Sequence, residues 1–286
     1  TLNQSLPGYV VMLDKRGGPI SGQPNWSSGF MPSTFQGTLF RPTGNPILDL
    51  AGPRYLDRTA QRRQLDLLEK LNQQHLRQRP GGEELLARMR SYELAFRMQS
   101  EAPDAVDLTR ESQQMLVAYG VGKQPTDEFG RNCLIARRLV ERGVRFVCLF
   151  HQGWDHHSNV VGGHRRACAV TDQPAAALVR DLKQRGLLED TLVVWCIEFG
   201  RMPTFQKGAS GRDHNPDGFT GWLAGAGVKR GHTYGALTPL GGKLKKTSPP
   251  STISTPPSFT FSAWTTSASP TTTTVLSAVS PTSTAM

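Results

Sequence analysis

The sequence contains few cysteines, and none of them is spaced for a structural metal site. The four cysteines of the 286-residue chain lie far apart and form no CxxC pair, and three of them sit inside apolar helix or strand patterns. Scattered cysteines of this kind are typical of small buried hydrophobic residues. The sequence therefore supports neither a zinc knuckle nor a disulfide framework, and it leaves the cellular compartment open.

Long apolar runs are also absent. No segment approaches the ~18 consecutive apolar residues of a transmembrane helix. The first residues, TLNQSLPGYVVMLD, contain no basic region and no initiating methionine, so no signal peptide is visible and we interpret the chain as a fragment. A hydrophobic content of 37% with 20% charged residues is ordinary for a soluble globular protein.

Acidic residues are missing from the last part of the chain. After Asp217 there is no Asp or Glu, while five Lys and Arg residues follow and contribute to the net charge of +10. The other basic residues are scattered through 54–63 and 77–97 and interleaved with acids, whereas a nucleic-acid footprint should cluster on one face. The GVGK stretch at 120–123 lacks the spacing of a phosphate loop. We therefore expect no nucleic-acid partner.

Apolar periodicity predicts an α/β protein. Runs of strand length predict strands at 9–13, 144–150 and 191–197. Helical spacing of apolar residues predicts helices at 59–76, 83–98, 109–119, 132–142 and 171–185. The order helix, glycine, strand is that of a crossover unit, so we expect a parallel sheet with polar residues gathered at one edge.

Candidate ligand side chains follow the strands at 144–150 and 191–197. The candidates are Asp155, His157, His164, Glu198, Asp213 and His214. Carboxylate and imidazole ligands together suit Zn, Mn or a similar divalent ion, and two-metal hydrolases use such mixtures. A DxH spacing alone is a weak signal, and a loop histidine is more often a surface residue than a ligand. The combination of several candidates at neighbouring strand ends is what predicts a polar functional site.

Two Gly-Arg pairs place guanidinium groups beside these acids. Arg201 and Arg212 could clamp an anionic group as anion-binding residues. They could equally neutralise Glu198 and Asp213 as structural ion pairs. No catalytic nucleophile is identifiable.

Three long segments carry a family resemblance. They are GVRFVCLFHQGWDHHSN, DLKQRGLLEDTLVVWCIEFGRMP and GRDHNPDGFTGWLAGAGVKRGHTYGA. They resemble signature segments of the bacterial domain of unknown function 1501 family, which is placed in the alkaline phosphatase and sulfatase superfamily. The resemblance covers about Pro7 to Ala236. It implies an alkaline-phosphatase-like α/β sandwich with a mostly parallel central sheet flanked by helices, incomplete in this chain.

The resemblance also implies a function. The matching positions for a divalent metal ion (Zn, Ca, Mg or Mn) are Asp155, His157, Glu198, Asp213 and His214. The implied activity is metal-dependent hydrolysis of phosphate or sulfate esters, with a small molecule or a glycan ester as substrate. The alternative is a non-catalytic binding or structural protein that retains the fold. Family members commonly carry export signals, so a periplasmic or secreted location is implied.

The catalytic half of the implied site is not recognisable. In this family a stretch resembling GGPSHxDxFDPK carries a metal-binding Asp and the nucleophile. The stretch Gly17-Gly18-Pro19-Ile20 is only superficially similar to it, because no His or Asp follows at the right distance. We therefore expect this copy to be an inactive fragment.

The composition changes after Ala236. Residues 237–286 are rich in Ser, Thr and Pro, which at face value predicts a disordered stalk outside a partial domain at 1–236. When the codons for Ser251 to Thr266 are read one base earlier, a consistent codon choice spells HDLHATILHLLGLDH. This sequence is an amphipathic helix of the kind that the family carries here. We therefore interpret the tail as the product of a single-base deletion near Ala236-Leu237.

Overall fold

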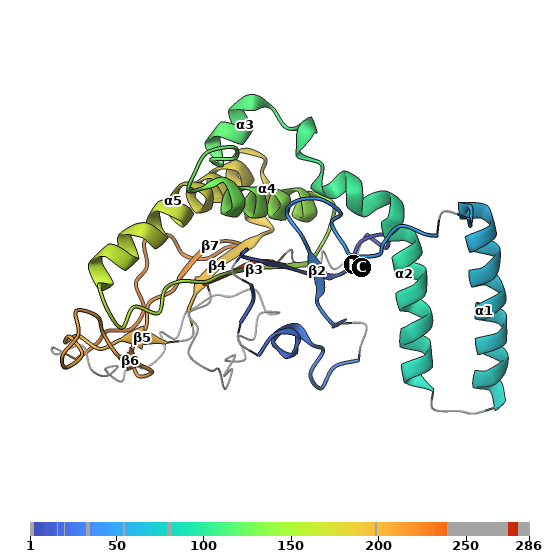
Figure 1. Ribbon diagram of the computed structural model, residues 1–286, viewed down its shortest axis with the longest axis horizontal. Helices are drawn as coiled ribbons and strands as arrows, with labels where there is room; N and C mark the ends of the chain where they lie inside the picture. The colour runs from blue at the N-terminus through green and yellow to red at the C-terminus, as the bar shows by residue number, and fades with distance from the viewer. Residues whose placement is uncertain are drawn as a thin grey trace.

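The protein is a mixed α/β structure (Figure 1). The computed structural model describes residues 3–15, 17–19, 21–32, 35–53, 55–78, 82–197, 199–238 and 274–279. The helices are α1 (Arg58–Gln78), α2 (Glu83–Val106), α3 (Gln113–Ala118), α4 (Asp127–Glu141) and α5 (Val160–Gln184). The strands are β1 (Tyr9–Leu13), β2 (Thr38–Phe40), β3 (Phe146–His151), β4 (Leu192–Cys196), β5 (Gly200–Arg201), β6 (His214–Asn215), β7 (Trp222–Gly225) and β8 (Thr274–Val279).

The main sheet has the strand order β2-β1-β3-β8-β4-β7. The unit β2-β1-β3 is parallel, as expected. β8 then lies between β3 and β4 and pairs antiparallel with both, and β7 pairs antiparallel with β4. Since β3 and β4 are both antiparallel to β8, they run in the same direction and their carboxyl ends reach the same edge. The sheet is therefore mixed beyond its parallel three-stranded unit.

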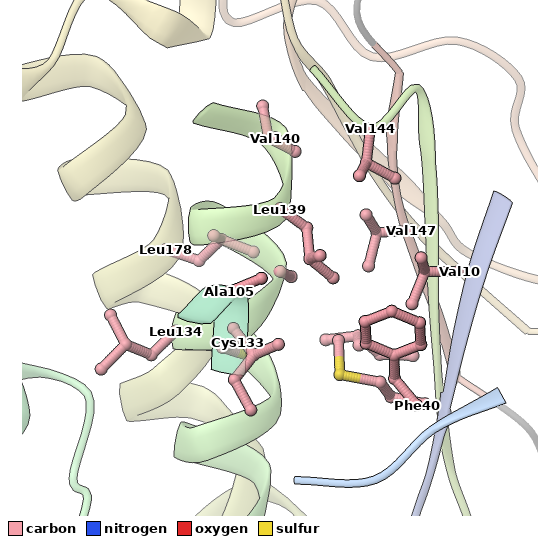
Figure 2. Close-up of a cluster of buried hydrophobic side chains, with 14 of the residues drawn as sticks. Val10, Phe40, Ala105, Cys133, Leu134, Leu139, Val140, Val144, Val147 and Leu178 are labelled. Atoms are coloured by element: carbon pink, nitrogen blue, oxygen red, sulfur yellow. The ribbon is translucent and has the colours of Figure 1, made fainter. Parts of the chain in front are cut away.

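Side chains of β1 and β3 alternate between two apolar clusters. Val10 and Val147 belong to the larger cluster, which includes Leu134 and Leu139 of α4. Figure 2 shows Val10 and Val147 on the strand side of this core, facing α4. Val11, by contrast, belongs to a smaller cluster on the other face of the sheet. This period of two is what the apolar runs predicted.

The smaller cluster is covered by the segment between β1 and β2. Trp26, at the end of a short 3-10 helix (Gln23–Trp26), is buried there against Phe150. The ring centroids of Trp26 and Phe150 lie 6.2 Å apart. In the described residues, α4 and α5 cover only the opposite face of the sheet (Figure 1).

Helices α1 and α2 form an antiparallel pair that extends away from the sheet (Figure 1). Arg62 of α1 pairs with Glu93 of α2 at 2.6 Å, and the Arg58 guanidinium lies 4.4 Å from the centroid of the Phe96 ring. The C-terminal part of α2 enters the larger core through Met98 and nearby alanines. Among the described helices, none has the length and apolar character needed to cross a membrane.

One predicted boundary differs in a way that matters for the site. The helix expected at 171–185 begins at Val160, so His164 is helical and does not belong to a loop. Asn159 caps the helix, accepting a hydrogen bond from the Gly162 amide at 3.2 Å. The early start was hidden because the first turns, VVGGHRRA, combine β-branched and glycine residues that have low helix propensity.

The expectation that the whole tail after Ala236 is disordered needs a correction. Thr274–Val279 forms β8, with five register pairs to β4 and six to β3. Its sequence, TVLSAV, holds valines and a threonine, which fit a pleated sheet well. Residues 239–273 and 280–286 lie outside the described part of the chain, so the frameshift interpretation and the boundary at 236 stay predictions.

Deleting 237–286 should therefore destabilise the protein, contrary to what the composition alone predicts. β8 makes ladder hydrogen bonds on both sides, each contributing ~0.5–1.5 kcal/mol net. Part of that gain offsets the cost of ordering the strand, so we expect a loss of about 2 kcal/mol in the free energy of unfolding. Chemical denaturation of the full chain, of the 237–286 deletion and of a control lacking only 281–286 measures it. If all three proteins are equally stable, β8 does not contribute to the stability of the fold.

Candidate metal centre

The site is built from the loop after β3 and the small sheet formed by β5 and β6. Asp155 and His157 lie between the end of β3 and the start of α5. In the β5–β6 ladder Arg201 and His214 are directly opposite each other, so both side chains project from the same face. The ladder thus presents a guanidinium and an imidazole together to the loop that carries Asp155.

Three ligand-type atoms converge there. His157 Nε2 lies 3.0 Å and His214 Nε2 lies 3.1 Å from Asp155 Oδ1. The two Nε2 atoms are 3.1 Å apart. Among the described residues, Asp155, His157 and His214 are the group whose geometry could hold a metal ion.

The second ring nitrogen of His157 favours this role. Its Nδ1 lies 2.9 Å from the side-chain oxygen of Gln206, so it donates a hydrogen bond there. In the neutral imidazole this leaves the lone pair on Nε2, which faces the cluster. An outer partner that fixes the tautomer of a ligating histidine in this way is a regular feature of metal sites.

Backbone contacts between two loops hold the cluster together. The amide of Val160 donates to the Ser210 carbonyl at 3.2 Å, and the amide of Arg212 donates to the His156 carbonyl at 3.1 Å. Gly211 lies between these two contacts, and a Cβ on it would come within 2.0 Å of the His157 backbone. The absence of a side chain at Gly211 is therefore what allows the loop before β6 to approach the histidine loop.

Arg201 sets the charge of the site. Its guanidinium donates to Asp155 Oδ1 and, at 3.1 Å, to the carbonyl of Arg212. Burial of Asp155 acts to raise its pKa, but the hydrogen bonds from Arg201 and His214 outweigh burial, so the pKa is lowered. Asp155 is therefore ionised at neutral pH, as a metal ligand must be.

The donor set and its spacing fit a divalent transition ion. Zn binds imidazole and carboxylate ligands at ~2.0–2.2 Å in a tetrahedron, so two ligands of one ion lie ~3.3–3.6 Å apart. The observed separations of 3.0–3.1 Å are slightly shorter, so the three ligand atoms would move apart by a few tenths of an ångström to hold Zn. Two histidines and one carboxylate leave coordination positions open, as catalytic sites do. Mn and Fe accept the same donors, whereas Ca and Mg prefer oxygen ligands alone.

Comparison with known proteins places the chain in a family. The family model described as "Protein of unknown function (DUF1501)" matches residues 1–255. The chain belongs to this family. No curated protein and no solved structure matches the chain. The DUF1501 match contains the whole of the candidate site, runs past Ala236 and ends before β8.

The other predicted site residues of this DUF1501 protein lie differently. Glu198 falls outside the described residues. Asp213 is exposed and accepts a hydrogen bond from the adjacent His214 amide at 2.8 Å, so its carboxylate is not in the three-residue group. Arg212 contacts the Met202 carbonyl at 3.4 Å and stacks its guanidinium over Phe205. At the site, Arg201 forms an ion pair with Asp155.

His164 lies near the cluster but outside it. Its ring is 5.2 Å from that of His156 and 5.8 Å from Trp154, centroid to centroid. Its Nδ1 donates to the Val160 carbonyl at 3.0 Å within α5. Burial, followed by the charges of His164 and Arg201, lowers the pKa of His156, so the His156 imidazole is neutral at pH 7.

The sequence did not predict two further features of the DUF1501 site. Gln206 has no motif around it and is recognisable only from the folded loop. Asp14 and His151 form a buried pair, Oδ2 to Nδ1 at 2.7 Å, at the carboxyl ends of β1 and β3. Each follows a predicted strand directly, so parallel pairing of those strands was the available signal.

Proposed function

We propose that this DUF1501 protein is a metal-dependent hydrolase-like protein that acts on phosphate or sulfate esters. The observation that carries the proposal is the convergence of Asp155, His157 and His214 with Arg201 on the same carboxylate. This proposal includes an alkaline phosphatase or sulfatase type of fold and a periplasmic or secreted location, both of which follow from the family resemblance alone.

The residues of the cluster have separate roles in this proposal. A divalent ion, when bound, would supply Lewis-acid polarisation of an ester oxygen. Asp155 would contribute the negative charge that holds the ion, and each of the two imidazoles would contribute a ring-nitrogen lone pair. Arg201 keeps Asp155 ionised and adds a fixed positive charge beside the site, which favours tetrahedral oxyanions. Gln206 holds His157 in the tautomer that directs Nε2 inward.

A non-catalytic binding protein is the second candidate. The observation that favours it is the composition of the three-residue cluster, which consists of one carboxylate and two imidazoles. Covalent ester hydrolysis needs an activated nucleophile, and metal binding alone leaves most of the barrier in place. Such a protein would capture an anionic group without turning it over.

Anion binding and turnover separate the candidates. With Zn or Mn present, we expect the chain to bind orthophosphate and sulfate, and Arg201→Gln to weaken this binding by about tenfold, a loss typical of one charged hydrogen bond. Arg165→Gln, which removes an exposed charge from α5, is the matched control and should change little. Titration calorimetry measures the binding.

Assays with p-nitrophenyl phosphate and p-nitrophenyl sulfate measure the turnover. Hydrolysis that requires both the metal and His214 supports the hydrolase. Binding without hydrolysis supports the second candidate and the expectation that this copy is inactive. Anion binding that does not depend on the metal contradicts both candidate functions, and so does a complete lack of anion binding.

A further inference from the structure

A hollow next to the cluster is lined by aromatic side chains that the proposed function does not use. Its volume is about 680 Å³, which is within the range of small-molecule sites. Trp195 of β4 and Trp222 of β7 form one wall, and Trp154 lies at one end. The opposite wall is α5, which contributes Asp172 and Arg180 among others.

The sheet fixes the tryptophans in place. Trp195 and Trp222 are directly opposite in the β4–β7 ladder, with ring centroids 5.9 Å apart and planes inclined by 13°. Trp154 meets Trp195 edge-on, at 6.2 Å and 89°. Cross-strand pairing stacks the two rings on one face of the sheet, so the aromatic wall is preorganised.

Small residues leave the space open. Ala175 and Ala176 of α5 face the hollow, and Ala224 follows two residues after Trp222 on the same face of β7. Each presents a methyl group where a larger apolar side chain would fill the gap between helix and sheet. β7 is the last strand of the main sheet among the described residues, so the hollow opens beside a sheet edge.

The polar groups at the hollow indicate the chemistry of a ligand. Asp172 and Arg180 are exposed, and they are separated by eight residues of α5, about 12 Å along the axis. Neither has an ion-pair partner in the described part of the chain. An aryl group would leave both charges unused, and an organic cation would be attracted by Asp172 but repelled by Arg180. A sugar ring has an apolar C–H face for the tryptophans and a rim of hydroxyls, which can accept from Arg180 or donate to Asp172.

We propose that this hollow binds a carbohydrate ring, so that the substrate of the neighbouring cluster is a sulfated or phosphorylated sugar. Trp154 directly precedes Asp155, which places the aromatic end of the hollow beside the cluster. The sugar would lie against Trp195 and Trp222 while its anionic group reaches Arg201. The ester part of this inference rests on the proposed function, whereas binding of the sugar ring does not.

Trp222→Ala tests the hollow with little risk to the fold, because Trp222 is 38% exposed on an edge strand. Leu223→Ala is the matched control, since Leu223 is 46% exposed and projects from the other face of β7. The probes are inorganic sulfate and the monosulfates of glucose, galactose and N-acetylglucosamine, titrated in the presence of Mn and followed by tryptophan fluorescence. We expect at least one sugar sulfate to bind tenfold or more tightly than inorganic sulfate. Trp222→Ala should remove this gain and leave the affinity for inorganic sulfate unchanged, and Leu223→Ala should retain it.

The outcomes separate this inference from the proposed function. If inorganic sulfate binds but no sugar sulfate binds more tightly, the hollow is not a sugar site and the proposed function stands. If inorganic sulfate fails to bind while unsubstituted oligosaccharides of the same sugars bind in a Trp222-dependent way, the hollow is a sugar site and the proposed function fails. Tighter, Trp222-dependent binding of p-nitrophenyl sulfate would make the hollow an aryl site and overturn the inference. A dimer in light scattering that Trp222→Ala dissociates would make it an interface and overturn the inference as well.

Discussion

Replacing Arg137 by methionine should lower the free energy of unfolding by about 3–5 kcal/mol, the usual cost of removing one partner from a buried ion pair. The side chain of Arg137 is 2% exposed and lies at the centre of a charge network. Its guanidinium pairs at 2.6 Å with both Glu111 and Glu141. Its Nε is 3.0 Å from Asp181 without hydrogen-bond alignment, so that contact is ionic only.

The loss is large because the partners stay behind. The side chain of Glu111 is 8% exposed, and burial acts to raise its pKa, yet the hydrogen bonds from Arg137 and Arg138 lower it. Without Arg137, Glu111 and Asp181 remain enclosed with less positive charge to balance them. The network also joins the segment before α3 to α4 and α5, so the effect should extend across the helical layer.

Arg131→Met on the same helix is the matched control. Arg131 pairs with Asp127 at 2.9 Å, but its side chain is 30% exposed. Partly exposed pairs of this kind contribute ~0–1 kcal/mol, so the control should stay close to the wild type. Urea denaturation of both variants measures the difference. If Arg131→Met and Arg137→Met lower the free energy of unfolding by similar amounts, the buried network stabilises the helical layer no more than a partly exposed ion pair does.

The second large effect is on metal binding. Asp155→Ala should reduce the affinity for Zn or Mn by more than ~100-fold, because losing even an outer partner of a metal ligand costs 10–100-fold. Asp155 provides the only negative charge in the group and holds Arg201. Asp213→Ala is the control, since Asp213 is exposed and bonded to its neighbour's amide. If both variants lose metal affinity equally, Asp213 is also a metal ligand, as the broader ligand set predicted from the sequence has it.

The central strands could be predicted because alternation determines which side chains are buried. The pattern in 9–13 reproduced β1, and β3 differs from its predicted range by two residues at its start and one at its end. β2, β5 and β6 span only two or three residues, too few for any periodic signal. β8 lies in a Ser/Thr/Pro-rich segment where composition favoured disorder, and its pairing depends on partners far away in the chain.

Part of the candidate site could be predicted because its residues follow segments with a clear sequence pattern. Asp155 follows a strand whose pattern was clear, and His214 was placed by its Gly-Arg repeat. The convergence of these residues with His157 is long-range, brought about by the approach of Gly211 to the histidine loop. Gln206 carries no local signal at all, because its role depends on where the loop before β6 is placed.

X-ray absorption at the metal edge of the Zn-loaded protein tests the central claim most directly. If Asp155, His157 and His214 hold one ion, the spectrum should show two imidazole nitrogens and one carboxylate oxygen at ~2.0–2.2 Å. The imidazole signature should fall from two rings to one in His157→Ala and in His214→Ala. Thiolate sulfur at ~2.3 Å, or a shell without imidazole, would contradict the account.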